Sequence, residues 1–426
     1  MNVTVFGLGK IGLPLATLYA SKGHLVTGVD LNESVIDQVN NSEVPFPNEV
    51  GLPDLLKIVT TNGLLKATSD ASKSVKSANV IVIAVPLYID SSKNPDFEAL
   101  DSVTELIASN IQNETLVIYE TTLPVGTTRN RFANWIQAKS GLVPGKDFFI
   151  AFSPERVSSG HVLEDIQKYP KIVGGLSDEC TRRARDFYNS VIDFQKRPDL
   201  VKPNGVWEVS SPEAAEFVKL AETTYRDVNI ALANQYSKDA EKLGLDVFDL
   251  IACANSQSYS HIHSPGISVG GHCIPVYPWL YMKSLGVNPL IHEARKVNDE
   301  ITNFYLEKLA TRVPLQGHNV VIYGLAYREG VKESAFSGAF TLKKLLEENG
   351  STVYLIDELY EPSEIVRYGF TNLPEDLKEF SLVIHTADNN LDDFISKFKD
   401  QILFVIEGRE NRRSASMILE ERYIGI

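Results

Sequence analysis

Short apolar runs alternate with helix-period segments over the first half of the chain. The apolar runs that predict strands are residues 3–6, 25–29, 80–85, 116–119, 148–152 and 171–173. The helix-period segments that fit between them are residues 11–22, 33–40, 97–110, 129–139 and 179–190. This alternation is typical of an α/β fold built on a parallel sheet.

A different pattern occupies the middle of the chain. Residues 196–211 are polar, contain two prolines and a glycine, and are predicted to be a connection. Ser211 and Pro212 are a suitable cap and first residue for a helix that continues to about Leu243, before Gly244. This helix is longer than most globular helices, so we expect it to span domains or to form an oligomer contact. Helical patterns continue to about Arg312.

A second alternating region begins at Asn319. Strands are predicted at residues 320–323, 353–356, 382–385 and 403–406, and a helix at 341–349 is closed by Gly350. The expected organisation is therefore α/β, then helical, then α/β.

Composition narrows the classes of function. The chain has 426 residues and a formal net charge of -14, which argues against nucleic acid or an anionic membrane as its main partner. Its three cysteines are widely spaced, and Cys and His show no metal-ligand spacing, so we expect neither a disulfide framework nor a metal. The longest apolar run, residues 80–88, is too short to span a bilayer. We expect a cytoplasmic protein.

A glycine fingerprint follows the first predicted strand. Gly7, Gly9 and Gly12 form the pattern G-x-G-x-x-G at the start of a helix, where glycines allow a dinucleotide pyrophosphate to approach the backbone. Asp30 ends the next strand, 18 residues after Gly12. A carboxylate there accepts hydrogen bonds from ribose hydroxyls and repels a 2′-phosphate, so NAD is predicted over NADP.

One cysteine lies in a glycine-rich loop. Cys273 follows Gly270, Gly271 and His272, and Pro275 suits the first turn of a helix. A thiol just before a helix N-terminus is favoured as the nucleophilic thiolate. The alternative is that Cys273 is a small buried hydrophobe.

Polar clusters follow two further strands. Thr122 lies in the segment 120–126, and Glu155 and Arg156 follow the strand 148–152. The carboxyl ends of parallel strands are where such sheets place ligands, although ordinary loop polarity would look the same. On the long helix, Lys219 shares a face with Thr223 and Arg226, which can line a site or face solvent.

Five motifs in this order, GLGKIGLP, ETTLPVGTT, SPERV, AEFVKLAETTYRDVN and VGGHCIPV, resemble the UDP-glucose/GDP-mannose dehydrogenase family. The resemblance covers nearly the whole chain. It implies oxidation of a nucleotide sugar at C6 to the uronic acid, with two hydrides passed in succession to NAD. It also implies an NAD-binding Rossmann domain at 1–205, a central helical dimerisation region at 206–312 that carries the catalytic Lys and Cys, and a Rossmann-like UDP-sugar domain at 313–426.

The resemblance assigns roles residue by residue. Cys273 is the nucleophile that forms the thiohemiacetal and thioester, Glu155 activates water for hydrolysis, and Lys219 stabilises the oxyanion. Thr122 holds a water near the reacting carbon, and Thr223 stands where the family commonly has Asn. The implied cofactor-binding residues are Gly7, Gly9, Lys10, Ile11, Gly12, Asp30, Val85, Pro86 and Thr121. The implied substrate-binding residues are Glu155, Arg156, Lys219, Arg226, Gly270, His272, Arg328 and Lys332.

His272 and the segment 225–230 look most like the enzymes of N-acetylated UDP-sugars, so a UDP-N-acetylhexosamine is the expected substrate. Tyr277 and Thr223 replace an Asp and an Asn that are usual in the family, which leaves open an epimerase or a single oxidation to an aldehyde or ketone. A non-catalytic protein that binds NAD and a nucleotide sugar is the third alternative. The expected partner is a small nucleotide sugar, and the expected assembly is a homodimer.

Overall fold

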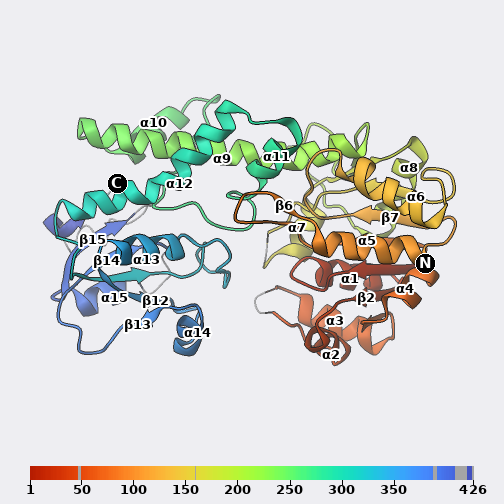
Figure 1. The fold of residues 1–426 in the computed structure, drawn as a ribbon, viewed down its shortest axis with the longest axis horizontal. Helices are drawn as coiled ribbons and strands as arrows, with labels where there is room; N and C mark the ends of the chain where they lie inside the picture. The colour runs from red at the N-terminus through yellow and green to blue at the C-terminus, as the bar shows by residue number, and fades with distance from the viewer. Residues whose placement is uncertain (47–48, 159, 387–390, 408–419, 425–426) are drawn as a thin grey trace. The chain divides into compact units, whose positions relative to one another are not determined.

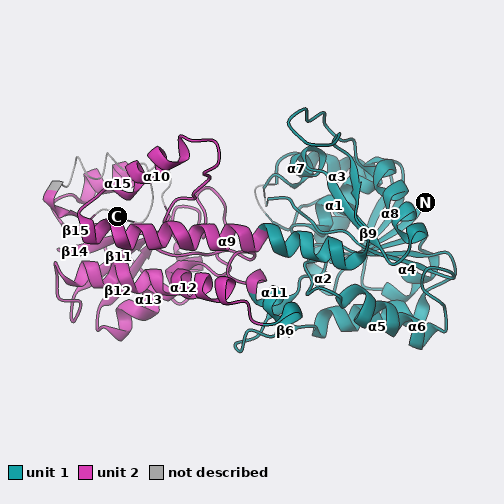
Figure 2. Ribbon diagram, turned by 90° about the horizontal axis from the view of Figure 1, so that it is seen from above, with its two compact units in different colours: residues 1–222, 279–286 teal, residues 223–278, 287–426 magenta. Residues whose placement is uncertain are grey.

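The computed structural model describes residues 1–46, 49–158, 160–386, 391–407 and 420–424. The chain divides into two compact units, which Figure 2 shows in different colours. Unit 1 comprises residues 1–222 and 279–286, and unit 2 comprises residues 223–278 and 287–426. Within the described ranges, no helix combines the length and apolar character needed to cross a membrane.

Unit 1 is built on an eight-stranded sheet with the order β10-β9-β8-β7-β4-β1-β2-β3. The strands are β1 (Asn2–Phe6), β2 (Leu25–Val29), β3 (Leu65–Thr68), β4 (Val80–Ile83), β7 (Leu116–Tyr119), β8 (Phe149–Phe152), β9 (Lys171–Gly175) and β10 (Val206–Glu208). All neighbouring pairs are parallel except β8 and β9. The order reverses between β1 and β4, which is where doubly wound sheets bind their ligands. A small hairpin of β5 (Tyr88–Ile89) and β6 (Pro95–Asp96) follows β4.

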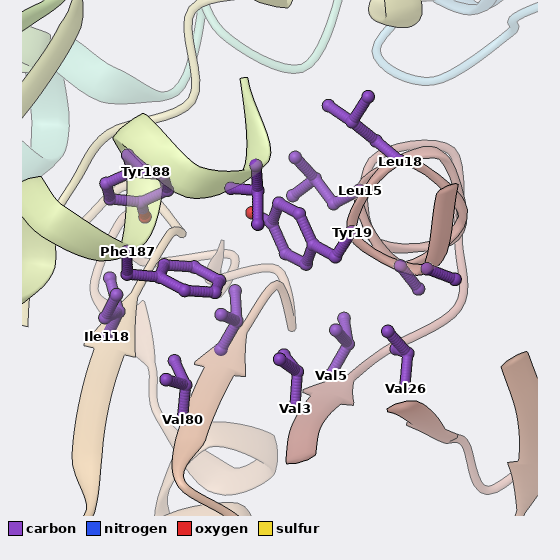
Figure 3. Packing of buried hydrophobic residues seen from close by; sticks show 14 of the residues in the cluster. Val3, Val5, Leu15, Leu18, Tyr19, Val26, Val80, Ile118, Phe187 and Tyr188 are labelled. Carbon is purple, nitrogen blue, oxygen red and sulfur yellow. The ribbon is translucent and has the colours of Figure 1, made fainter. Parts of the chain in front are cut away.

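The helices of unit 1 lie between these strands in the chain (Figure 1). They are α1 (Gly12–Ser21), α2 (Glu33–Asn40), α3 (Leu52–Thr61), α4 (Ala71–Ser77), α5 (Glu98–Asn110), the π-helix η1 (Thr128–Ala133), α6 (Asn134–Ser140), α7 (Val162–Lys168) and α8 (Asp178–Val191). Figure 3 shows side chains of α1 and α8 packed over the apolar face of the strands. Tyr19 of α1 and Phe187 of α8 meet edge to face, with ring centroids 5.2 Å apart. This packing joins α1 to α8 over the sheet.

Helix α9 (Pro212–Leu243) belongs to both units, because the division falls after residue 222. The Ser211 hydroxyl accepts a hydrogen bond from the Ala214 N–H (3.2 Å), as expected for an N-cap. Gly244 follows the helix with φ of 67°, a left-handed conformation that suits glycine. The predicted start and end of the long helix are therefore confirmed.

Unit 2 contains a fully parallel sheet with the order β13-β12-β11-β14-β15-β16. Its strands are β11 (Asn319–Tyr323), β12 (Thr352–Ile356), β13 (Thr371–Asn372), β14 (Phe380–Ile384), β15 (Ile402–Glu407) and β16 (Tyr423–Ile424). Its helical segments are α10 (Val247–Asn255), α12 (Pro289–Ala310), α13 (Gly338–Glu348), α14 (Pro362–Arg367), α15 (Leu391–Phe398) and the short η2 (Glu420–Arg422). Helix α11 (Tyr277–Leu285) begins in unit 2 and continues in unit 1.

A buried polar network fastens α9 to α12 within unit 2. Arg295 of α12 pairs with Asp227 of α9, and the Asn298 amide donates to the same carboxylate (2.8 Å). Arg295 and Asp227 are at most 1% exposed. The Asn234 side chain accepts a hydrogen bond from the Gly266 N–H (2.9 Å), which ties the loop that leads to Cys273 to α9.

The predicted α/β fold class, with a sheet at each end and helices between, is confirmed. The prediction is wrong in two details of the first sheet. Strand β9 runs antiparallel to β8, although the alternation predicted a wholly parallel sheet. The stretch 196–211 contains β10, which pairs with β9 through backbone bonds that its polar sequence does not indicate.

Candidate functional site

The turn after β1 has the geometry of a dinucleotide-binding loop. Gly7 has φ of 86°, a conformation that L side chains rarely adopt. A Cβ on Gly12 would lie 1.8 Å from the Gly7 carbonyl oxygen, so only glycine fits where α1 begins. Ile11, the residue before the helix, has no side-chain oxygen with which to cap its N-terminus. The helix end therefore presents backbone amides of the kind that bind pyrophosphate.

Asp30 lies beside this turn. Its carboxylate accepts hydrogen bonds from the N–H groups of Leu8 (2.8 Å) and Asn32 (2.9 Å). A Cβ placed on Gly7 would lie 3.5 Å from the Val85 side chain, so the segment after β4 borders the same turn. Val85 is half-buried, Pro86 is exposed, and Thr121, after β7, is buried. The residues present thus fit an adenine dinucleotide at the point where the sheet order reverses.

A buried charged cluster lies at the neighbouring strand ends of unit 1. The Lys171 ammonium donates to Glu155 Oε2 (2.8 Å) and also pairs with Glu120 Oε1 (2.5 Å). The Tyr188 hydroxyl donates to Glu120 Oε1 (2.6 Å), and the Tyr19 hydroxyl donates to Oε2 (3.2 Å). Burial opposes the charged form of Lys171, but Glu120 and Glu155 outweigh it and raise the pKa of the ammonium above its ordinary value. Lys171 is therefore a fixed cation between two carboxylates.

A second network joins the SPERV segment to α9. The Arg156 guanidinium donates to Glu222 Oε2 (2.8 Å), and Lys219 Nζ lies 3.5 Å from Glu222 Oε1. The Lys219 side chain is only 8% exposed, which excludes the solvent-facing alternative for this residue. The Arg156 N–H also donates to Glu155 Oε1 (2.7 Å). Two predicted site residues of unit 1, Arg156 and Lys219, are thus brought together through Glu222, and Glu155 is joined to them through the Arg156 N–H.

The loop that carries Thr122 is anchored to α9 by a different carboxylate. Glu216 accepts hydrogen bonds from the N–H groups of Gly126 (2.5 Å) and Thr128 (2.8 Å) and from the Thr128 hydroxyl (2.6 Å). Thr122 itself is 8% exposed. Burial raises the pKa of Glu216 to about 7, although the hydrogen bonds oppose this shift.

In unit 2, close backbone packing shapes the loop before Cys273. A Cβ on Gly270 would lie 2.9 Å from the Phe336 carbonyl oxygen and 3.0 Å from Tyr327 Cβ. Gly271 has φ of 94°, and a Cβ there would lie 2.9 Å from the Tyr327 ring. Cys273 is a half-buried free thiol, and its carbonyl accepts from the Tyr277 N–H (2.9 Å) at the start of α11. The structure thus supports the accessible thiol over the fully buried alternative.

Charged groups surround this loop within unit 2. Burial raises the pKa of Tyr327, and Cys273 and Glu333 add to the shift, whereas Arg328 and Arg226 oppose it. His272 Nε2 lies 3.6 Å from Glu333 Oε2. The predicted residues Arg226, Gly270, His272, Cys273 and Arg328 therefore cluster around Tyr327.

Two predicted residues have other surroundings. The Lys332 ammonium donates to both carboxylate oxygens of Glu364 (2.6 and 2.8 Å) and lies 5.1 Å from the centre of the Tyr360 ring. Its charge is thus largely matched by Glu364, a partner that the sequence did not indicate. The Thr223 side chain is fully buried in α9.

Lys171, Glu222, Tyr327 and Glu333 were not predicted as site residues from the sequence. Glu222 stands three residues after Lys219 on a helix, a spacing that brings side chains together and could have indicated the pair. Lys171 begins a strand and carries no such local signal.

A dinucleotide turn in one unit, and a thiol held in a glycine-rich loop beside basic side chains in the other, define an oxidoreductase that uses a nicotinamide cofactor. Residues 1–192 match the family model described as UDP-glucose/GDP-mannose dehydrogenase family, NAD binding domain, and residues 213–300 match its central domain. The chain belongs to this family of nucleotide-sugar dehydrogenases.

Individual proteins similar to this chain carry names from the same family. The chain is 34% identical over 365 residues to UDP-N-acetyl-D-mannosamine dehydrogenase of Pyrococcus horikoshii, which covers 84% of this chain and 83% of the relative. It is 30% identical over 419 residues to the enzyme of the same name from Methanococcus maripaludis, covering 95% and 92%. The solved structure of UDP-D-ManNAc dehydrogenase from Pyrococcus horikoshii matches with a TM-score of 0.86 and 29% identity over 100% of this chain and 99% of that one.

Proposed function

We propose that this protein is an NAD-dependent UDP-sugar 6-dehydrogenase that converts the C6 alcohol of a UDP-N-acetylhexosamine to the carboxylate. The observation that carries the proposal is the half-buried Cys273 thiol, which follows two crowded glycines, Gly270 and Gly271, and acts with Arg226 and Arg328 on Tyr327. The relatives named UDP-N-acetyl-D-mannosamine dehydrogenase support this class of substrate.

The chemistry needs a thiol at one stage. NAD, when bound, would supply the hydride acceptor, and the two hydrides need two NAD molecules in succession. After C6 has lost its first hydride and its hydroxyl proton, the Cys273 thiolate adds to the aldehyde carbon and the carbonyl oxygen takes up a proton, which gives a thiohemiacetal. Loss of a second hydride and of that hydroxyl proton leaves a thioester on the sulfur. Water then attacks the carbonyl carbon, the C–S bond breaks, and the acid and the thiolate are released.

Three side chains of unit 1 supply the remaining roles. Glu155 accepts the proton of the attacking water, since it is a carboxylate held beside Lys171. Lys219, nearly buried beside Glu222, stabilises the oxyanion that develops on the sugar. Thr122 orients the water, because its loop is fixed by Glu216.

NAD is proposed over NADP because of Asp30. Two backbone N–H groups hold its carboxylate at the end of β2, where it would accept hydrogen bonds from a ribose and repel a 2′-phosphate.

Epimerisation or a single oxidation is not favoured, because the similar proteins are named dehydrogenases. Tyr277 nevertheless stands where Asp is usual, half-buried at the start of α11. A phenol is a poor base at neutral pH, so we expect turnover slower than in relatives with Asp and faster in Tyr277→Asp. We also propose that the protein acts in the cytoplasm, as its three free cysteines suit a reducing compartment.

Selective alkylation tests the role of Cys273. Cys180 is buried and Cys253 is exposed, so Cys253 is the competitor that matters. We expect iodoacetamide to modify Cys273 first and bound UDP-sugar to protect it, by peptide mass spectrometry. Cys273→Ala should bind NAD and UDP-sugar but form no acid, whereas the matched Cys253→Ala should remain active. Preferential modification of Cys253 with no protection at Cys273 would contradict the proposal.

A further inference from the structure

We propose that Lys171 and Glu120 are positioning residues that set the proton affinity of Glu155: Lys171 keeps Glu155 ionised, and Glu120 keeps Lys171 paired when Glu155 takes a proton. The inference rests on the proposed role of Glu155 as the base of thioester hydrolysis.

The geometry makes Lys171 a bridge. Its ammonium contacts one oxygen of each carboxylate, at 2.8 Å from Glu155 and 2.5 Å from Glu120. The carboxylates come from the loops after β8 and β7, and Lys171 is the first residue of β9. Three adjacent strands therefore fix the three charges relative to one another.

Burial makes the arrangement energetically important. The side chains of Glu120, Lys171 and Glu155 are 0%, 4% and 10% exposed. A charge in such surroundings is strongly disfavoured when its partner is removed or neutralised. Glu155 is the most exposed member, so it is the one that water and substrate can reach.

The other polar groups that face the cluster support Glu120 as the permanent partner. Tyr188 of α8 and Tyr19 of α1, both labelled in Figure 3, donate their hydroxyl hydrogens to Glu120. The Tyr188 ring also lies 4.9 Å from the Lys171 ammonium. The Ser153 hydroxyl donates to the Ile172 carbonyl, and the Arg156 guanidinium is paired with Glu222 of α9.

The consequence for the reaction follows from charge balance. During hydrolysis a C–O bond forms to water, Glu155 takes one proton, and the C–S bond breaks with the electron pair leaving on sulfur. If Lys171 had no second carboxylate, protonation of Glu155 would leave a buried ammonium unpaired. Burial raises the pKa of Glu120 and the charge of Glu155 adds to the shift, whereas Lys171 and the Tyr188 hydroxyl oppose it. Because protonation of Glu155 removes its charge, it favours the ionised form of Glu120, and the Lys171 ammonium then keeps a charged partner.

Removal of the negative charge of Glu120 and removal of the positive charge of Lys171 should therefore move the pH dependence of hydrolysis in opposite directions. In Glu120→Gln, Lys171 pairs with Glu155 alone, so Glu155 should become a weaker base. The limb of the pH–rate profile of thioester hydrolysis that reports this base should then move down by about one pH unit. In Lys171→Met, Glu155 loses its cation and faces Glu120, so the limb should move up by about one unit. Lys171→Arg should restore the wild-type position.

The measurement is the rate constant, as a function of pH, for loss of the substrate-derived adduct on Cys273. It is followed by acid quench and intact mass with UDP-N-acetylmannosamine and NAD. Glu49→Gln is a matched control, because Glu49 is a buried carboxylate whose bonds go to the backbone N–H groups of Gly160 (2.9 Å) and Val162 (2.6 Å). We expect no shift of the limb in this variant.

Each outcome of this experiment either supports the inference or overturns it. Opposite shifts in the two variants support the inference; slower hydrolysis with unmoved limbs, or shifts in one direction, overturns it as a merely structural effect. If Lys171→Met does not fold, as judged by NAD binding, the near-isosteric Glu120→Gln decides alone. Absence of NADH formation by the wild type, or undiminished hydrolysis in Glu155→Gln, overturns the proposed function instead.

Discussion

The carboxylate of Asp30 is oriented by two backbone amides, so its position does not depend on a flexible side chain alone. We expect Asp30→Ala to weaken NAD binding by about 1–3 kcal/mol, through loss of hydrogen bonds to a charged acceptor. Calorimetric titration with NAD and NADP measures this loss, and Asp30→Asn separates shape from charge. Tighter binding of NADP than of NAD by the wild-type protein would contradict the assignment.

Glu216 links the stability of unit 1 to pH. Its pKa of about 7 exceeds the ordinary value of 4.5, so the folded protein binds this proton more tightly than the unfolded chain does. Its contribution is therefore largest below pH 4.5 and is lost as the pH rises toward 7. The cost of Glu216→Gln should be about 2 kcal/mol larger at pH 5 than at pH 7.5.

Urea unfolding of wild type and Glu216→Gln at the two pH values measures this difference. Glu213→Gln is the control, because the side-chain hydrogen bond from Arg129 leaves the pKa of this partly exposed glutamate lowered against the effect of burial. A cost that is equal at both pH values, or larger at pH 7.5, would show that Glu216 titrates normally.

At the residue scale, the sequence indicated the groups that stand in motifs. Cys273, Glu155 and Lys219 each have a recognisable setting of glycines, proline or helix spacing, and the structure finds each at least half-buried among polar partners. Lys171 could not be found in this way. Lys171 meets Glu155 and Glu120 because β7, β8 and β9 are neighbours in the sheet, and local sequence does not determine the order of strands.

At the scale of elements, α9 exposes an apolar stripe. Tyr225, Leu232 and Tyr236 follow the spacing of one helix face and are 55%, 42% and 41% exposed. The length of this helix predicts a homodimer contact at its apolar positions, among them Phe217, Leu220, Ile230 and Leu232. Of these, Phe217 and Leu232 are exposed and Ile230 is half-buried. The prediction is wrong for Leu220, because this residue is fully buried within the chain.

The stripe leads us to expect a homodimer that depends on α9. Leu232→Glu and Tyr236→Glu should shift the protein toward monomer, since a charge opposite an apolar partner is costly. Sedimentation velocity at micromolar concentration measures the shift, and Lys242→Glu, exposed on the same helix away from the stripe, should have no effect. A monomeric wild-type protein would remove the prediction.

The bounds predicted for β2, β7 and α2 are those that the structure shows. Short polar elements were missed, among them β3, α7 and β10. Their stability comes from pairing with neighbours that are already ordered, and a single sequence does not display those neighbours. The direction of β9 was wrong for the same reason.

At the scale of the whole chain, the two sheets share a turn but not a cofactor motif. Gly324 has φ of 101°, and Asp357 accepts from Leu325 N–H (2.6 Å), as Asp30 accepts from Leu8 N–H (2.8 Å). The second sheet lacks the glycine pattern that opens α1, because residues 324–337 form a longer segment before α13. We therefore expect one dinucleotide site per chain, in unit 1.

The stoichiometry of NADH tests the central claim most directly. Purified protein should be given limiting UDP-N-acetylmannosamine or UDP-N-acetylglucosamine with excess NAD, with NADH followed by absorbance and the product by mass spectrometry. We predict two NADH per sugar and the uronic acid with at least one of these substrates, and no uronic acid in Cys273→Ala. One NADH per sugar with an aldehyde product, or an epimer without NADH, would contradict the account.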